Sequence, residues 1–257
     1  MRLVRFESEG RTGYGILEGE KIQVLWGTPY DGGLENTTGE LMTLSEVTLL
    51  APCEPTKIIA LGMNYRDHAA EIGLPVPEEP LIFMKPSTAV IGPDADIVYP
   101  GMSKRVDYEA ELAVVIGRPA RHVPEAEAFN YILGYSAFND VTARDLQQKD
   151  IQFTRSKSFD TFAALGPWIE TEIADPDRLT VEAFLNGERR QHSNTGNLVF
   201  GVATLVSFIS RIMTLLPGDV IATGTPAGIG PMLPGDVVEV RVEGIGTLQN
   251  RLVAERV

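Results

Sequence analysis

The segment RVDYEAELAVVIG, residues 105–117, constrains the fold of this chain more than any other stretch. Read with the two-residue period of a β-strand, it places most of its apolar side chains on one face. Asp107, Glu109 and Glu111 then share the other face, with neighbours roughly 6.6 Å apart along the strand. The far end of that face is apolar, so it does not resemble ordinary solvated surface. The fold must therefore supply something that makes three crowded anions tolerable.

Composition narrows the class of protein. The 257 residues, 44% of them hydrophobic, suffice for one large domain or one domain with a small appendage. The net charge of −13 argues against binding a nucleic-acid backbone and gives no sign of attraction to anionic membranes. Cys53 is the only cysteine, so an intrachain disulfide is excluded and a reducing compartment is expected.

Two segments bear on location. The opening MRLVRFESEG has no apolar run of the signal-peptide type. The most apolar stretch, residues 198–216, carries Arg211 and several Ser and Thr residues, which favours a core helix over a membrane span. We therefore expect a cytoplasmic protein with no membrane partner.

The chain divides near its prolines. Residues 1–25 alternate in polarity and turn at glycines, which predicts a small β-meander. Pro52 and Pro55 then mark a linker before a short apolar strand at 58–61. We expect a small N-terminal β domain over 1–53 and a second domain over 54–257.

The second domain is dominated by β signals. Asn186-Gly187 lies between strand-like arms and predicts a hairpin, and LPGDV occurs twice as a turn before an apolar strand. Residues 237–253 end the chain with another hairpin. Helical periodicity is confined to 141–149 and 203–215. The expected class is mixed and β-rich (α+β), and no Gly-x-Gly-x-x-Gly follows a strand, which excludes a doubly wound nucleotide binder.

Acidic residues from two segments could form a metal site. A Glu-x-Glu pair such as Glu109 and Glu111 is, alone, more often a solvated sheet face. Asp140, however, sits where a strand enters a helix, and Thr142 with Asp145 resembles a capping box that leaves Asp140 free. Three carboxylates would form the all-oxygen cage that Mg²⁺ or Mn²⁺ prefers. A bound cation would also offset the repulsion on the strand.

Arg144 and Gln147 follow Asp140 at i+4 and i+7, which predicts one helical face. Arg144 could hold a substrate carboxylate by a bidentate contact, with Gln147 as a neutral donor. A solvated helix face is the alternative.

His68 has Glu71 three residues on, so both side chains lie on one helical turn. A carboxylate beside an imidazole orients it and raises its basicity, as a general base requires. Gly73 and the prolines after it suggest a mobile loop that acts as a lid. His122 and His192 have no such neighbour and are interpreted as surface residues.

Two further residues are candidates. Lys157 precedes a run of aromatic and small apolar residues, where a lysine can neutralise a developing enolate; a surface salt bridge is the alternative. Thr225 lies in the Gly-rich turn of VIATGTPAGIG, whose amides and hydroxyl could hold an anion, or which is a plain hairpin turn.

Five segments in this order resemble the fumarylacetoacetate hydrolase superfamily, in its short branch with a single catalytic domain. They are GMNYRDHAAE, DYEAELAVVIG, GYSAFNDVTARDLQ, KSFDTFAALGPW and TGTPAGIGP, and the resemblance runs from about Lys57 to the C-terminus. It implies a β-roll or β-sandwich catalytic domain, a homodimer, and Mg²⁺ or Mn²⁺ in the site.

The resemblance also assigns roles by motif position. It makes Glu109, Glu111 and Asp140 the metal ligands, and it makes His68, Glu71 and Lys157 the catalytic residues. Arg144, Gln147 and Thr225 match substrate-contacting positions. A further Asp ligand of the eponymous hydrolase has no counterpart here, which argues against fumarylacetoacetate as the substrate. Asp107 has no assigned role.

The expected function is metal-assisted chemistry on a small 2-oxo acid or dicarboxylate through an enolate. The first choice is an isomerase or decarboxylase of aromatic catabolism, of the 2-hydroxyhepta-2,4-diene-1,7-dioate or 5-carboxymethyl-2-hydroxymuconate type. Acylpyruvate hydrolysis and oxaloacetate decarboxylation are the alternatives. A non-catalytic β domain that binds a structural cation is the rival from another class.

Overall fold

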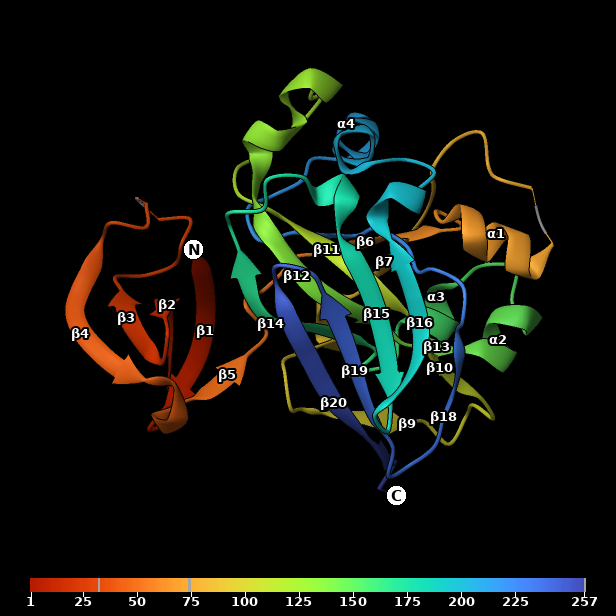
Figure 1. The fold of residues 1–257 in the computed structure, drawn as a ribbon, viewed down its shortest axis with the longest axis horizontal. Coiled ribbons are helices and arrows are strands. Elements are labelled where there is room, and N and C mark those ends of the chain that lie inside the picture. The colour runs from red at the N-terminus through yellow and green to blue at the C-terminus, as the bar shows by residue number, and fades with distance from the viewer. Residues whose placement is uncertain (32, 74, 257) are drawn as a thin grey trace.

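Hydrogen-bonded strands dominate the fold, so the predicted β-rich class with few helices is confirmed (Figure 1). The computed structural model describes residues 1–31, 33–73 and 75–256. Its largest sheet has twelve strands, ordered β4-β3-β2-β1-β14-β12-β11-β17-β6-β7, with β5 paired to β1 and β8 to β14. The strands are β1 (Arg2–Ser8), β2 (Arg11–Glu18), β3 (Lys21–Leu25), β4 (Thr37–Thr43), β5 (Thr48–Leu50), β6 (Ile58–Gly62), β7 (Leu81–Lys85), β8 (Val90–Ile91), β11 (Ala110–Ile116), β12 (Ile132–Asp140), β14 (Ala163–Glu170) and β17 (Val220–Ala222).

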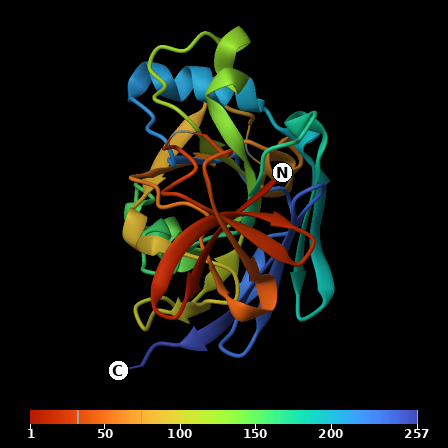
Figure 2. The ribbon, with the colours of Figure 1, turned by 90° about the vertical axis from the view of Figure 1, so that its left-hand side faces the viewer.

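The N-terminal strands form the predicted meander. β1 to β4 pair in sequence order around a small core of their own, made by Val4, Phe6, Leu17 and Ile22. Figure 2 shows this unit in front of the rest of the molecule. β1 also pairs with β14, so the large sheet continues from one unit into the other. A domain division at residue 53 remains our proposal.

A second sheet packs against the large one. Its strand order is β16-β15-β19-β20-β9, and in Figure 1 it lies in front of β11 and β12. Asn186 and Gly187 join β15 to β16 with positive φ angles of 52° and 80°, which confirms the predicted hairpin. The apolar faces of both sheets share one core. These strands are β9 (Asp96–Tyr99), β15 (Thr180–Leu185), β16 (Glu188–Asn194), β19 (Val237–Val242) and β20 (Gly246–Ala254).

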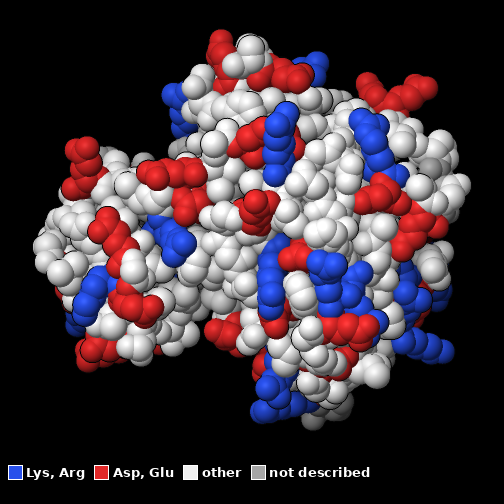
Figure 3. Space-filling model, viewed as in Figure 1, with Lys and Arg blue, Asp and Glu red and all other residues white. Residues whose placement is uncertain are grey.

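In the part of the chain that the structure describes, four α-helices lie at the edges of the sheets: α1 (Arg66–Ile72), α2 (Arg144–Lys149), α3 (Thr154–Lys157) and α4 (Val202–Ile212). α4 buries one face, including Leu205 and Ile209, which confirms the predicted core helix. Among the residues described, no helix is both long and apolar enough to cross a bilayer. On the face in Figure 3, acidic and basic side chains are interspersed.

The predicted helix at 141–149 begins later than expected, at Arg144. Asp140 ends β12, and the next residues form β13 (Thr142–Ala143), which pairs with β10 (Val106–Tyr108); β18 (Gly230–Met232) completes this three-stranded sheet. Asp140 therefore does not share a helical face with Arg144 and Gln147. The capping-box prediction is also wrong, because α2 has no side-chain cap and Thr142 donates to Glu109 Oε1 (3.1 Å).

Candidate active site

A break between two strands places the acidic cluster. β10 ends at Tyr108 and β11 begins at Ala110, so Glu109 lies between them, and its carbonyl accepts the Asp140 backbone N–H (2.9 Å). Because β11 is a central strand with every residue buried, its polar face is enclosed too. Asp107, Glu109 and Glu111 are accordingly all buried, as is Asp140.

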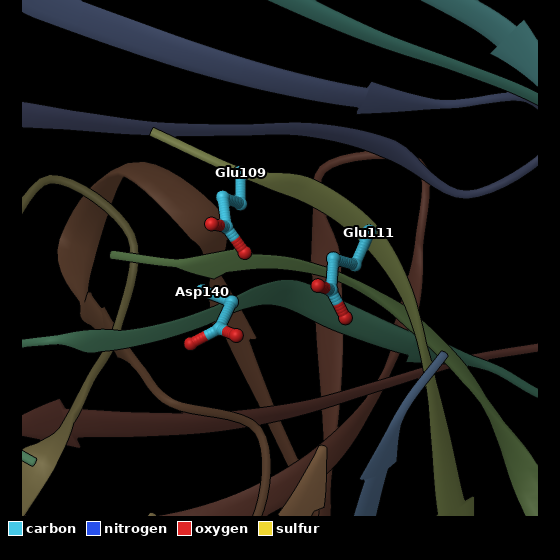
Figure 4. Close-up of side chains that lie close together, drawn as sticks. All are labelled: Glu109, Glu111 and Asp140. Atoms are coloured by element: carbon cyan, nitrogen blue, oxygen red, sulfur yellow. The ribbon is translucent and has the colours of Figure 1, made fainter. Parts of the chain in front are cut away.

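The structure brings the three predicted metal-ligating side chains together. Carboxylate oxygens of Glu109, Glu111 and Asp140 all lie within 4.8 Å of one another (Figure 4). We call these three residues the carboxylate triad. Two come from the β10–β11 segment and the third from the end of β12, as the sequence predicts.

Buried cations surround two members of the triad. Lys157 Nζ donates to Glu109 Oε2 (2.7 Å) and to Asp140 Oδ2 (2.6 Å). Lys85 Nζ binds the other Asp140 oxygen, and Arg144 donates to Glu109 Oε1 (2.5 Å). Burial would raise the pKa of Glu109, but Lys157 and Arg144 outweigh it and lower that pKa to about 2. Glu109 is thus held as an anion.

Glu111 differs from its two neighbours. Its Oε2 accepts the Gly224 N–H (2.8 Å), but among the described residues its Oε1, though buried, has no hydrogen-bond partner. Burial, and then the charges of Asp140 and Glu109, raise the pKa of Glu111 well above its usual range. A fully buried carboxylate in this position requires either a proton or a positive ion beside it.

The triad fits a hard divalent cation. It offers carboxylate oxygens, the donor type that such ions prefer, from a buried and converging set. The unpartnered Glu111 oxygen supplies a site for positive charge that no side chain fills. The triad could therefore hold a metal ion.

The predicted dyad is formed on α1. His68 Nδ1 lies 3.0 Å from Glu71 Oε2, and Glu71 Oε1 accepts the Gly228 backbone N–H (3.0 Å). Asp67 accepts from Ser193 Oγ (2.5 Å), so α1 is fastened to β16 as well. His68 is 8% exposed. His122 and His192 are exposed, as predicted, although His192 has a partner in Glu182.

A cavity of about 560 Å³ lies between His68 of the dyad and Glu109 of the triad. Six predicted site residues line it: His68, Glu109, Arg144, Gln147, Lys157 and Thr225; Glu111 and Asp140 are not among the lining residues. The apolar lining residues include Leu61, Leu81, Phe83, Phe153 and Ile229. Glu71 is not among the lining residues and contacts the cavity through His68.

Two predicted substrate contacts are engaged within the protein. Arg144 donates through Nε to Asp107 (2.9 Å), through one terminal nitrogen to Glu109, and through the other to Gln147 Oε1 (2.6 Å). Three of its five N–H donors are therefore used on side chains of this chain. Thr225 Oγ1 donates to the Ala110 carbonyl (3.0 Å). Its hydroxyl proton is therefore used in a hydrogen bond within the protein.

Sequence reasoning missed Lys85, Asp107 as a partner for arginine, and Gln191. Lys85 is completely buried at the end of β7 and contacts Asp140. Asp107 accepts from both Arg105 and Arg144. Gln191 donates to Thr225 Oγ1 (2.9 Å) and accepts the Ala110 N–H (2.9 Å). The number of buried acids could have indicated these partners, because four buried carboxylates require several buried cations nearby.

Comparison with models of known protein families shows the family of this chain. Residues 57–253 match the model described as fumarylacetoacetate (FAA) hydrolase, C-terminal. The chain belongs to the fumarylacetoacetate hydrolase family. Residues 1–52 match a second model, described as Rv2993c-like, N-terminal.

Relatives within the family span nearly the whole chain. A protein of Archaeoglobus fulgidus is 56% identical, over 98% of this chain and 96% of its own. The crystal structure of a 5-carboxymethyl-2-hydroxymuconate delta-isomerase from Mycobacterium smegmatis is 46% identical, with a TM-score of 0.93 over 99% of this chain and 100% of that one. The mitochondrial oxaloacetate tautomerase FAHD2B of Bos taurus is 42% identical over 81% of this chain and 70% of its own.

Proposed function

We propose that this family member is a divalent-metal-dependent isomerase that moves a proton between carbon and oxygen, or between two carbons, of a small 2-oxo acid. The observation that carries the proposal is a cavity lined by Glu109 of the carboxylate triad, by Lys157 and by His68 of the His68–Glu71 dyad. The two relatives named above as an isomerase and a tautomerase carry out proton shifts of this kind. The activities for which they are named support the reaction class.

Glu109, Glu111 and Asp140 would hold the ion, for which we propose Mg²⁺ or Mn²⁺. When bound, such an ion supplies Lewis-acid polarisation of a 2-oxo group. Among the residues of this chain, His68 is the proposed base that takes a proton from the carbon next to the carbonyl. Glu71 holds the imidazole through Nδ1, which directs the other ring nitrogen to act on substrate.

Lys157 is the proposed electrostatic partner of the enolate. Its ammonium group lines the cavity and is almost fully buried, so its charge acts in a medium of low polarity. Burial would lower the pKa of Lys157, but Asp140 and Glu109 raise it above its usual range. The group therefore stays charged and serves as a stabiliser rather than a base.

Decarboxylation and C–C hydrolysis also give an enolate, but they form it by breaking a carbon–carbon bond rather than by removing a proton. The cavity supplies one imidazole for proton transfer, which suffices for isomerisation. We also propose that the protein is a cytoplasmic homodimer, on the strength of the family resemblance.

Deuterium exchange at C3 of oxaloacetate, followed by NMR in D₂O, tests the proposal. We expect exchange above the rate with metal alone, its loss on chelation, and a decrease of about 10²- to 10⁴-fold in His68→Ala. Products of decarboxylation or hydrolysis would appear in the same spectra. If the wild type binds Mg²⁺ but catalyses no deuterium exchange in any 2-oxo acid, the proposal is wrong. The alternative of a non-catalytic β domain that binds a structural cation would then hold.

A further inference from the structure

Arg105 is the most accessible cation of the site. It immediately precedes β10 and lines the same cavity as Glu109 and Lys157. Its side chain is 47% exposed, whereas Arg144 is 10% and Lys157 only 2% exposed. A ligand in the cavity can therefore reach Arg105 without displacing protein groups.

Asp107 fixes the orientation of that guanidinium. Arg105 Nε donates to Asp107 Oδ1 (2.8 Å), and one terminal nitrogen donates to Asp107 Oδ2 (3.1 Å). The other terminal nitrogen makes no hydrogen bond to the residues described. This fork holds the plane of the group in place, so a carboxylate that binds the free edge meets a donor that is already ordered.

Arg105 differs from Arg144 in its accessibility to a ligand. Asp107 is completely buried and serves both guanidinium groups. Arg144 also pairs with Glu109 and donates to Gln147. Among the described residues, Arg105 pairs with Asp107 alone, and its side chain is the more exposed of the two, so it is the arginine better placed to bind a ligand.

A second carboxylate matches what Arg105 offers. In the proposed function, the part of the cavity lined by Glu109 and Lys157 receives the 2-oxo and adjacent carboxylate groups of the substrate. The distal part must then lie among the remaining walls, and several of these are apolar. A distal methyl group gains nothing from an arginine, whereas a carboxylate gains a charged hydrogen bond.

We propose that Arg105 is a specificity-determining residue that recognises the distal carboxylate of a 2-oxo dicarboxylate. The inference rests on the proposed function for the reaction, and it adds the residue that selects a diacid over a monoacid. Asp107 is the positioning residue for Arg105.

Paired substrates test the selection. With Mg²⁺ present, C3 exchange is compared for oxaloacetate, a diacid, and pyruvate, which lacks the distal carboxylate. We expect the wild type to prefer the diacid in kcat/KM, and Arg105→Gln to reduce that preference by about 10- to 100-fold while pyruvate exchange is kept. Arg105→Lys should restore part of the preference because it keeps the charge. Lys104→Gln, at an exposed neighbour outside the cavity, is the matched control and should behave as wild type.

A binding comparison separates this inference from the reaction itself. Malate and lactate differ in the same distal group and need no turnover, so calorimetry with Mg²⁺ reports recognition alone. Tighter binding of malate that Arg105→Gln abolishes supports the inference even if no exchange is seen, in which case the proposed reaction fails by itself. An unchanged malate preference in Arg105→Gln, or an equal loss of malate and lactate binding, overturns it.

Discussion

Lys85 and Lys157 bind opposite oxygens of one carboxylate, that of Asp140. Lys85 approaches from β7 and is not among the cavity-lining residues, whereas Lys157 lines the cavity. Burial lowers the pKa of Lys85, and Asp140 opposes that effect. The two lysines therefore differ in position: Lys85 contacts Asp140 from β7, away from the cavity lining, and Lys157 contacts it from the cavity side.

Replacing Lys85 should destabilise the fold. Lys85→Met removes a completely buried partner of Asp140, and we expect a loss of about 3 kcal/mol in the free energy of unfolding. Chemical denaturation measures this, with Lys104→Met as the surface control. A Lys85→Met protein as stable as wild type would show that the buried pair contributes nothing.

Gly224 connects the triad to the segment before α1. Its N–H binds Glu111, its φ is +100°, and an added Cβ would lie 2.9 Å from Asn64 Cβ. A left-handed conformation costs a residue with a Cβ about 1–2 kcal/mol, and the contact with Asn64 adds to this cost. We therefore expect Gly224→Ala to lower the free energy of unfolding by roughly 3 kcal/mol. The variant should also weaken metal binding, because the Gly224 N–H holds Glu111.

Gly10→Ala is the matched control for that variant. Gly10 also has a positive φ, +76°, but an added Cβ would meet nothing within 4 Å. Thermal melts of the two variants separate backbone strain from steric clash. Equal decreases in the unfolding temperature of both variants would mean that the contact with Asn64 does not contribute to the destabilisation.

The sequence was sufficient for the triad because strand periodicity determines which side chains share a face. That rule placed Glu109 beside Glu111, although the strand is broken at Glu109, and Asp140 was placed by its position at a strand end. The dyad was equally local, since three residues along a helix bring side chains together. The Asn186-Gly187 hairpin could be predicted for the same reason, because its signal is local in the sequence.

Partners that are far apart in the sequence could not be predicted in this way. Lys85 lies 55 residues from Asp140, and Gln191 lies 34 residues from Thr225, so no local period links them. The start of α2 was misplaced because pairing of β13 with β10, a tertiary contact, outweighed the helical pattern. Arg144 was assigned to substrate because the sequence could not show that its donors are already used.

Glu71 should matter for turnover rather than for metal binding. Glu71→Gln keeps an acceptor for the Gly228 N–H but removes the charge beside His68. We expect kcat to fall by about 10- to 100-fold with unchanged Mn²⁺ affinity. Glu78→Gln, at an exposed position, is the control. Full activity in Glu71→Gln would remove the dyad from the mechanism.

The pKa of Glu109 predicts an acid-sensitive contribution to stability. Because its folded-state pKa is lowered from 4.5 to about 2, the group stabilises the fold at pH values above 4.5. That contribution is lost as the pH falls from about 4.5 towards 2. The difference in unfolding free energy between wild type and Glu109→Gln, measured without metal, should shrink across this window. A difference that stays constant with pH would contradict the assignment.

Titration of the metal-free protein with Mn²⁺, followed by the EPR signal of the free ion, tests the central claim most directly. Convergence of Glu109, Glu111 and Asp140 on one ion predicts a single site per chain that Glu111→Gln weakens strongly. The same substitution removes a buried carboxyl group whose raised pKa disfavours folding at neutral pH, so the metal-free variant should unfold at a higher temperature than the metal-free wild type at that pH. Equal Mn²⁺ affinity in wild type and Glu111→Gln, or no binding in either, would contradict the account.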